Sequence, residues 1–281
     1  MNYRHAYHAG NFADVFKHAI LTRILVYLAK KPAPLRYIDT HAGLGLYDLR
    51  QSEAQKTGEW RGGIGKLAHI PPGPARDLLQ PWLDCLGDLD ADGCPARYPG
   101  SPVLAQRLLR PQDSLRLCEL HPEDADLLDI HIGHDPRAKI LAQDGYAGLN
   151  ALVPPPERRG LVLMDPPFEV PGEFGRMRKA LLKAHAKWRE GVYALWYPLK
   201  DSAAADFGTE IVQAGVRRVL RLQMDFGADP AMPGALSACG LLLVNPPYVL
   251  EAEARLLLPA LQAALAPTGR GKWSVEWLAG E

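Results

Sequence analysis

The stretch Gly-Leu-Val-Leu-Met-Asp-Pro-Pro-Phe at residues 160–168 determines the fold. Its apolar residues do not alternate with polar ones, which predicts a strand buried on both faces of a sheet. A Pro-Pro pair follows, and proline cannot continue the hydrogen-bond ladder of a central strand. The strand should therefore end at Asp165, at the edge of the sheet where open α/β folds bind their ligands.

Similar apolar segments recur along the chain, with helical patterns between most of them. They lie at residues 35–39, 115–119, 138–142, 191–196, 217–222 and 240–245. With 160–165 they make seven strands. We therefore predict an α/β fold in which helices cover both faces of the sheet.

Two further segments complete the predicted organisation. A helix is expected from Phe12 to Lys30, capped by Asn11. Its apolar face comprises Phe12, Val15, Phe16, Ala19 and Ile20. Residues 46–99 contain many prolines and glycines, which predicts a mostly helical insertion after the first strand. The main domain would then comprise 1–45 and 100–281, and its second part would open on a short helix from Ser101 to Arg110, with Ser101 as its cap.

Composition limits the class of protein. The chain has 281 residues, 47% of them hydrophobic, and a formal net charge of zero, which fits a folded protein and excludes a strongly basic one. Because no signal-peptide core or membrane-length apolar run is present, we expect a cytoplasmic protein. The four cysteines have no C-x-x-C spacing, which predicts free, buried thiols; they are Cys85, Cys94, Cys118 and Cys239.

One local basic feature stands out against the neutral total. Arg176, Lys179, Lys183 and Lys187 have the spacing of one helix face. We interpret this face either as an ordinary solvated surface or as a patch that contacts RNA phosphates.

Acidic residues follow several predicted strands. Asp39 opens an Asp-x-x-x-Gly-x-Gly turn at 39–45, which lacks the third glycine of the dinucleotide fingerprint. Glu119 could accept both hydrogen bonds of a ribose diol. Asp144 could accept from the amino group of an adenine, with Gly145 turning the chain beneath the ring. Each acid alone is compatible with an ordinary turn, but together they indicate a nucleotide-like cofactor.

The tetrapeptide at 165–168 indicates methyl transfer to a base amine. An exocyclic amine is a poor nucleophile because its lone pair is delocalised into the ring. Acceptors on its N–H groups oppose this delocalisation, and Asp165 and the carbonyl of Pro166 supply two. Phe168 offers a ring on which the base can stack. The alternative, a purely structural Pro-Pro turn, does not require an acid and an aromatic residue beside the prolines.

A second such tetrapeptide occurs at 245–248, as Asn-Pro-Pro-Tyr. An amide oxygen could also accept from a base amine. However, this copy follows the seventh strand, which runs antiparallel in methyltransferase sheets of this type and ends at the opposite edge. We predict a structural turn there.

Further motifs extend over nearly the whole chain. They are Tyr-Arg-His-Ala-Tyr-His-Ala-Gly-Asn at 3–11, Lys-His at 17–18, Asp-Thr-His-Ala-Gly at 39–43, Tyr-Pro-Gly-Ser-Pro at 98–102, Glu-Leu-His-Pro at 119–122, Asp-Gly at 144–145 and Ala-Leu-Trp-Tyr-Pro at 194–198. With these motifs the chain resembles the RlmJ-type 23S ribosomal RNA adenine-N6 methyltransferases. One departure is Phe168, because the family usually has tyrosine there.

The resemblance implies a Rossmann-like class I methyltransferase fold with a mostly parallel sheet of seven strands and an inserted helical subdomain. It implies S-adenosylmethionine as cofactor and Asp165 as the catalytic acceptor. It places the cofactor against His18, His41, Ser101, Glu119, Asp144, Gly145 and Asp165. It places Tyr3 against the substrate, 23S ribosomal RNA, in addition to Pro166 and Phe168. We expect a monomer without metal or membrane.

Three alternatives remain from the sequence alone. Asp-Pro-Pro-Phe also occurs in enzymes that methylate the N2 amine of guanine in ribosomal RNA, so that base is the first alternative. The second is a non-catalytic RNA-binding module on the same scaffold, although it would not need acids at several strand ends. The third, a nicotinamide-dependent oxidoreductase, is disfavoured by the missing glycine.

Overall fold

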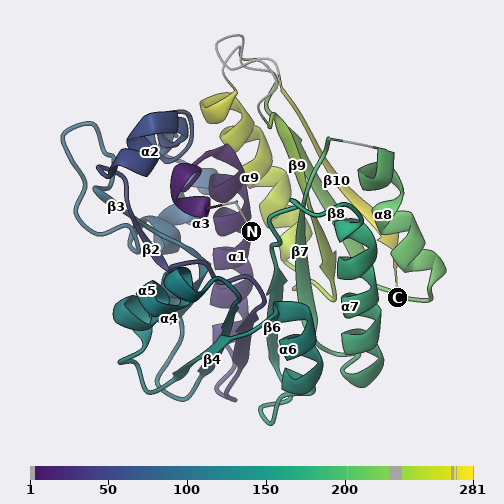
Figure 1. Cartoon of the computed structure of the whole chain (residues 1–281). Helices are drawn as coiled ribbons and strands as arrows, with labels where there is room; N and C mark the ends of the chain where they lie inside the picture. The colour runs from purple at the N-terminus through teal and green to yellow at the C-terminus, as the bar shows by residue number, and fades with distance from the viewer. Residues whose placement is uncertain (1–3, 201, 228–235, 267–268, 270, 281) are drawn as a thin grey trace.

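The computed structural model describes residues 4–200, 202–227, 236–266, 269 and 271–280. The main-sheet strands are β1 (Arg36–Asp39), β4 (Ser114–Glu119), β5 (Ala138–Ala142), β6 (Gly160–Met164), β7 (Val192–Pro198), β8 (Val219–Asp225), β9 (Ala238–Val244) and β10 (Lys272–Ala279). Over the described residues these eight strands form one sheet in the order β10-β8-β9-β7-β6-β1-β4-β5 (Figure 1). The α/β prediction is confirmed.

The seven predicted strands are all present, within a few residues of their expected limits. β1, β4, β5, β6 and β7 pair in parallel, whereas β9 runs antiparallel to both β7 and β8, as predicted. The eighth strand, β10, was not predicted. It lies at the edge of the sheet, where exposed residues such as Trp273 and Glu276 interrupt the buried ones, so it lacks the continuous apolar pattern of the central strands.

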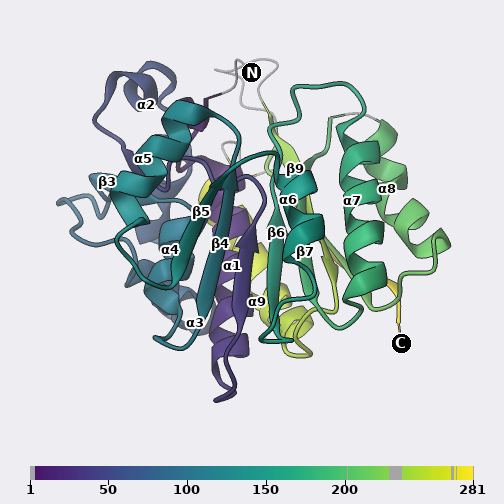
Figure 2. The same cartoon turned by 60° about the horizontal axis from the view of Figure 1, so that its bottom comes forward.

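Helices cover the sheet on both faces. α1 (Phe12–Ala29), α4 (Ser101–Leu108), α5 (Pro122–Ile132) and α9 (Leu250–Leu265) contribute to one apolar core, and α6 (Gly145–Leu152), α7 (Glu173–Lys187) and α8 (Ser202–Gln213) to the other. Figure 2 shows α6, α7 and α8 side by side over the second face. Within the described residues, no helix is both long and apolar enough to cross a membrane.

The first helix, α1, confirms its predicted start and cap. Asn11 accepts a hydrogen bond from the backbone of Asp14 at 3.0 Å. The predicted apolar face packs in the core, and most of the rest of α1 is buried as well, because the sheet and other helices enclose it on nearly every side. Its buried residues include Asp14, Lys17 and His18, which therefore need polar partners inside the protein.

Residues 46–99, the predicted insertion, contain β2 (Leu46–Asp48), α2 (Ser52–Thr57), two 3₁₀ helices (Glu59–Gly62 and Ile64–His69), α3 (Pro74–Leu83) and β3 (Arg97–Pro99). β2 and β3 pair antiparallel, which brings the two ends of the segment together. Trp82 on α3 is fully buried in the core that also contains α1. The segment therefore packs as a continuation of that core, and its treatment as a separate subdomain stays a prediction.

The cysteines confirm their prediction, and Ser101 contradicts its predicted role as a helix cap. The four cysteines are free and buried, as predicted. Ser101 is not the cap of its helix: Gly100 is, and Ser101 is the first helical residue. Its hydroxyl is directed to Asp39 instead, at 2.6 Å.

Candidate active site

Four acidic side chains lie at the carboxyl edge of the parallel strands. β6, β1, β4 and β5 are successive neighbours in the sheet. Asp165, Asp39 and Glu119 stand at the ends of the first three, and Asp144 follows the fourth as the cap of α6. The topology thus brings together the acids that the sequence analysis selected, at the edge where such sheets bind ligands.

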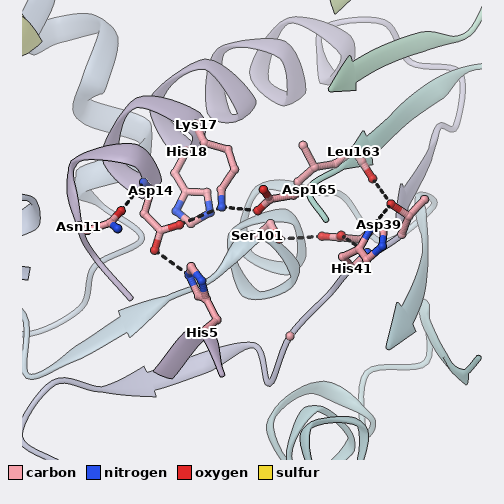
Figure 3. A network of polar contacts seen from close by, with 12 residues as sticks. His5, Asn11, Asp14, Lys17, His18, Asp39, His41, Ser101, Leu163 and Asp165 are labelled. Carbon is pink, nitrogen blue, oxygen red and sulfur yellow. Dashed lines mark hydrogen bonds and ion pairs between the residues drawn. The ribbon is translucent and has the colours of Figure 1, made fainter. Parts of the chain in front are cut away.

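Asp165 is held by a lysine from α1. Lys17 donates from Nζ to Asp165 Oδ2 and, at 2.8 Å, to Asp14 Oδ1 (Figure 3). The Lys17 side chain is only 6% exposed and that of Asp165 is 18% exposed. Burial by itself lowers the pKa of Lys17, but the charges of Asp14 and Asp165 outweigh it and raise the pKa above its usual value. Lys17 therefore stays a cation and fixes the carboxylate of Asp165.

Lys17 was not predicted as a site residue. It lies 148 residues before Asp165, and only the fold brings the two together. The sequence nevertheless indicates a special environment for Lys17, because this lysine interrupts a run of apolar residues in the first predicted helix. A lysine in such a run either leaves the core or finds a buried counter-charge.

Asp14 connects this pair to the first residues of the described chain. Its Oδ2 accepts from the ring of His5 at 2.9 Å and from the backbone of Gly10 at 2.8 Å. Burial raises the pKa of Asp14, but His5 and Lys17 together hold it well below its usual range. His5 was also not predicted as a site residue. The predicted substrate contact, Tyr3, lies outside the described residues.

Phe168 has an unusual backbone conformation. Its φ is +52°, in the left-handed region that a bulky residue rarely adopts and that is enriched at functional sites. Its ring meets Phe174 at 4.9 Å and Trp196 at 5.9 Å between centroids, both edge-on. The half-buried ring is thus held by two aromatic neighbours, directly after the buried Pro166 and the half-buried Pro167.

Asp39 lies at the centre of a buried polar cluster. Its Oδ2 accepts from Tyr37 at 2.7 Å and from Ser101 at 2.6 Å, and its Oδ1 from the backbone of His41 at 3.2 Å. Burial raises the pKa of Asp39 to about 6, against these hydrogen bonds. The cluster fixes the turn after β1, and it places Ser101 and His41 at the same edge as Asp165.

Glu119 fixes the neighbouring turn. It is 7% exposed, and its two carboxylate oxygens accept from the backbone of Gly43 and of His121, each at 2.8 Å. Burial raises its pKa. The carboxylate is therefore oriented before any ligand binds, and each oxygen keeps a lone pair for another donor.

Asp144 and Gly145 begin α6. Asp144 accepts from the backbone of Ala147 through Oδ1 at 2.9 Å. A side chain on Gly145 would lie 1.8 Å from the carbonyl oxygen of Thr40, so α6 contacts the turn after β1 directly. Close packing against Thr40 therefore requires a glycine at position 145, in addition to the predicted turn beneath a ligand ring.

The two predicted histidines differ in position. His41 meets Tyr146 edge-on at 5.1 Å, and burial lowers its pKa to about 4, so its ring is neutral near pH 7. His18 lies beside Lys17 on α1 and is 1% exposed (Figure 3). Its Nδ1 lies 2.6 Å from the hydroxyl of Tyr98. Burial lowers the pKa of His18 to about 3. Both rings are neutral hydrogen-bonding groups near the acids.

The second tetrapeptide lies at the opposite edge. Asn245 follows antiparallel β9 with a φ of +53°, and its amide nitrogen donates to the carbonyls of Arg189 and Gly191 at 2.7 and 2.8 Å. These contacts fix the connection before β7. The prediction of a structural turn is confirmed.

The arrangement of donors and acceptors fits an adenosine-containing cofactor beside a base amine. Carboxylates suited to a ribose and to an adenine amine lie at the ends of the adjacent strands β4 and β5. The Asp-Pro-Pro-Phe turn lies at the same edge, at the end of β6, with β1 between β6 and β4. Among the described residues, no group of three or more His, Cys, Asp or Glu side chains is arranged to hold a metal ion.

Comparison with known proteins places this chain in a family. Residues 32–279 match the family profile "RsmJ: Ribosomal RNA large subunit methyltransferase D, RlmJ". The chain is 37% identical over 282 residues to "Ribosomal RNA large subunit methyltransferase J" of Escherichia coli (strain K12), and 38% identical over 288 residues to the protein of the same name from Haemophilus influenzae; both alignments cover 100% of each chain. A crystal structure of protein LPL1258 from Legionella pneumophila covers 96% of this chain and 98% of its own, with 34% identity and a TM-score of 0.86.

Proposed function

Because this chain belongs to the RlmJ family of ribosomal RNA large subunit methyltransferases, we propose that it methylates the N6 amine of an adenine in 23S ribosomal RNA, with S-adenosylmethionine as the methyl donor. The family makes the chain an enzyme that methylates ribosomal RNA. The base, its amine and the residues that hold the ligands are the proposal. The observation that carries it is Asp165, fixed by Lys17 at the end of β6 and followed by the Pro-Pro-Phe corner.

The cofactor is assigned to the carboxyl edge of β1, β4 and β5. When bound, S-adenosylmethionine supplies an activated methyl group on a sulfonium. Glu119 would accept from its ribose hydroxyls and Asp144 from its adenine amine, while Gly145 would lie under the ring. His18, His41, Ser101 and Asp165 would complete the lining.

The target amine is assigned to Asp165 and to the carbonyl of Pro166. Lys17 occupies Oδ2 of Asp165, so we assign the amine to Oδ1. Two acceptors on the N–H groups localise the nitrogen lone pair, and Asp165 is the first acceptor for the proton that leaves. Lys17 is a positioning residue, since it orients the acceptor without touching the base.

The target base must leave its stack in the RNA to reach the Asp-Pro-Pro-Phe turn. Phe168 would then offer its ring for stacking, a contact worth about 1–3 kcal/mol in other proteins that bind unpaired bases. Phe174 and Trp196 hold that ring in place. Tyr3 is proposed to contact the RNA as well, as the family resemblance implies.

The decisive experiment is methylation of transcribed, unmodified 23S ribosomal RNA with labelled cofactor. The RNA is then digested to nucleosides, and the labelled product is identified by mass spectrometry. N6-methyladenosine supports the proposal. N2-methylguanosine as the only product would overturn the assigned base, and a chain without cofactor affinity in calorimetry would overturn the assigned chemistry.

A further inference from the structure

Arg176, in the first turn of α7, lies against the carboxylate assigned to the cofactor's adenine. Its Nη2 donates to Asp144 Oδ2 and its Nη1 to Glu173 Oε2, each at 3.2 Å. Its guanidinium carbon lies 5.2 Å from the ring centroid of Tyr146, whose hydroxyl donates to Glu173 Oε1 at 2.7 Å. Contacts with Asp144, Glu173 and Tyr146 thus hold Arg176 beside the proposed cofactor position.

The two ion pairs of Arg176 differ in burial. The Glu173 side chain is 4% exposed, whereas those of Asp144 and Arg176 are 39% and 47% exposed. An exposed ion pair is weak and exchanges readily, because water solvates both partners once they separate. The Glu173 end therefore anchors the guanidinium, and the Asp144 end is free to change partners.

A bound adenine amine would compete with Arg176 for Asp144. Oδ1 of Asp144 already accepts from the backbone of Ala147, at the start of α6. Oδ2 is the oxygen that Arg176 uses. Each oxygen keeps one lone pair, so an adenine amine that bonds to Oδ2 must share that oxygen with Arg176 or displace it.

Displacement would change the charge presented to RNA. In the present arrangement the carboxylates of Asp144 and Glu173 outnumber the single charge of Arg176, which disfavours a phosphate nearby. A guanidinium released from Asp144 can instead bind phosphate oxygens with its planar N–H groups. Arg176 also lies on the same exposed face of α7 as Lys179 and Lys183, at the end of the helix that is nearer to the candidate site.

We propose that Arg176 is a cofactor-gated phosphate-binding residue. It leaves Asp144 when the cofactor's adenine takes that carboxylate, and it then contacts a backbone phosphate next to the target base. This inference rests on the proposed function, since it uses the same cofactor position. Its consequence is that cofactor and RNA strengthen each other's binding by the same factor.

The test measures binding rather than turnover. Filter binding of transcribed 23S ribosomal RNA is carried out with and without S-adenosylhomocysteine, and calorimetry gives the affinity for S-adenosylhomocysteine alone. In the wild type, S-adenosylhomocysteine should tighten RNA binding by about two- to fivefold, the scale of one exposed ion pair. In Arg176→Gln the tightening should disappear, while S-adenosylhomocysteine binds at least as tightly as before.

Arg178→Gln is the matched control. Arg178 is an arginine on the same helix, paired with Glu210 of α8 rather than with the site, and its loss should leave the tightening intact. Tightening that persists in Arg176→Gln would overturn the inference. So would weaker S-adenosylhomocysteine binding by that variant, because Arg176 would then hold the cofactor instead of giving way to it.

The outcome also separates this inference from the proposed function. A wild type that forms N6-methyladenosine, together with an Arg176→Gln variant that keeps the tightening, refutes only the gating. A wild type that does not bind S-adenosylhomocysteine refutes both.

Discussion

At the scale of single residues, the site depends on a buried row of charges. Lys17 stands between Asp14 and Asp165, and His5 contacts the far side of Asp14. Lys17 and the two carboxylates compensate one another's desolvation, so the removal of one leaves a buried charge with fewer partners. Under the proposed function, stability and catalysis therefore depend on the same side chains.

Lys17→Met should impair both properties. The variant leaves Asp14 buried with fewer partners, which should lower the free energy of unfolding by about 3 kcal/mol. It should also reduce the rate of methyl transfer, since Asp165 loses the group that orients it. Urea unfolding and single-turnover methylation measure the two effects.

The double variant Lys17→Met, Asp14→Leu separates them. It removes the buried charge of Asp14 and should regain part of the stability, because an apolar pair of similar volume can replace a buried ion pair. The rest stays lost because the Gly10 backbone and His5 lose their acceptor. Methyl transfer should stay as slow as in the single variant. Recovery of both properties would show that Lys17 serves only the fold.

His18 makes stability depend on pH. Its pKa is about 3 in the folded protein and near 6.5 in an unfolded chain, so below pH 6.5 only the unfolded state takes up this proton. Its contribution therefore falls as the pH drops, by about 1.4 kcal/mol per unit once the unfolded imidazole is charged. The raised pKa of Asp39 acts in the opposite direction between about pH 4 and 6.

A comparison of wild type with His18→Gln isolates this effect. Glutamine keeps a hydrogen-bonding group near Tyr98 but does not titrate. The difference in unfolding free energy between pH 7.5 and pH 5 should be smaller in the variant. Equal pH dependence in the two proteins would mean that His18 is protonated in the folded state.

Single residues of the candidate site differ in how far the sequence predicts them. Asp165 could be selected from the sequence because its neighbours in the chain are two prolines and an aromatic residue, and the structure places it at the expected edge of the sheet. Lys17 reaches Asp165 only through the fold, and His5 contacts Asp14 rather than Asp165, so the residues around them do not specify the contact with Asp165. Local patterns reveal chemistry carried by one segment and miss chemistry shared between segments.

At the scale of elements, patterning predicted the strands better than it predicted helix environments. Central strands such as β6 are apolar throughout because both faces are covered, and this pattern is visible in sequence. β10 pairs with β8 at the edge of the described sheet, and exposed residues stand among its buried ones. Its sequence therefore shows neither the continuous apolar run of a central strand nor a regular alternation. α1 departed from an amphipathic pattern because elements pack around it on nearly all sides.

α7 has the predicted basic face, and its four basic residues are all exposed. We expect Lys179 and Lys183 to attract RNA phosphates. Changing both to Glu should weaken binding of 23S ribosomal RNA and flatten its dependence on salt, because fewer counterions are released. Filter binding between about 50 and 200 mM salt covers the useful range.

The matched control is the pair Lys30→Glu and Lys31→Glu. These exposed lysines follow the last turn of α1, at the end of the helix away from Lys17 and the site. The same charge change there should have a smaller effect. Equal losses in the two double variants would indicate an effect of overall charge and would contradict a specific patch on α7.

At the scale of the whole molecule, the segment 46–99 shares its core with the main sheet's helices. Trp82 and Leu79 on α3 belong to the same apolar cluster as α1 and α9. Composition indicated a helical insertion, but it could not show whether the insertion has a core of its own, because that depends on which helix its apolar face meets.

Trp82→Ala should therefore destabilise the entire protein. Loss of a fully buried tryptophan typically costs about 3–5 kcal/mol. Because the core is continuous, circular dichroism and tryptophan fluorescence should report one shared unfolding transition at lower denaturant. An additional early transition confined to 46–99 would contradict this picture.

The enclosure of α1 also has a consequence for the nascent chain. α1 is the first long helix to leave the ribosome, yet α9, which packs on it, is translated more than two hundred residues later. Until α9 emerges, apolar side chains of α1 remain exposed to water and to chaperones. Translation that stops before α9 would release a chain that already contains Lys17, the lysine that contacts Asp165, but cannot enclose the helix that carries it.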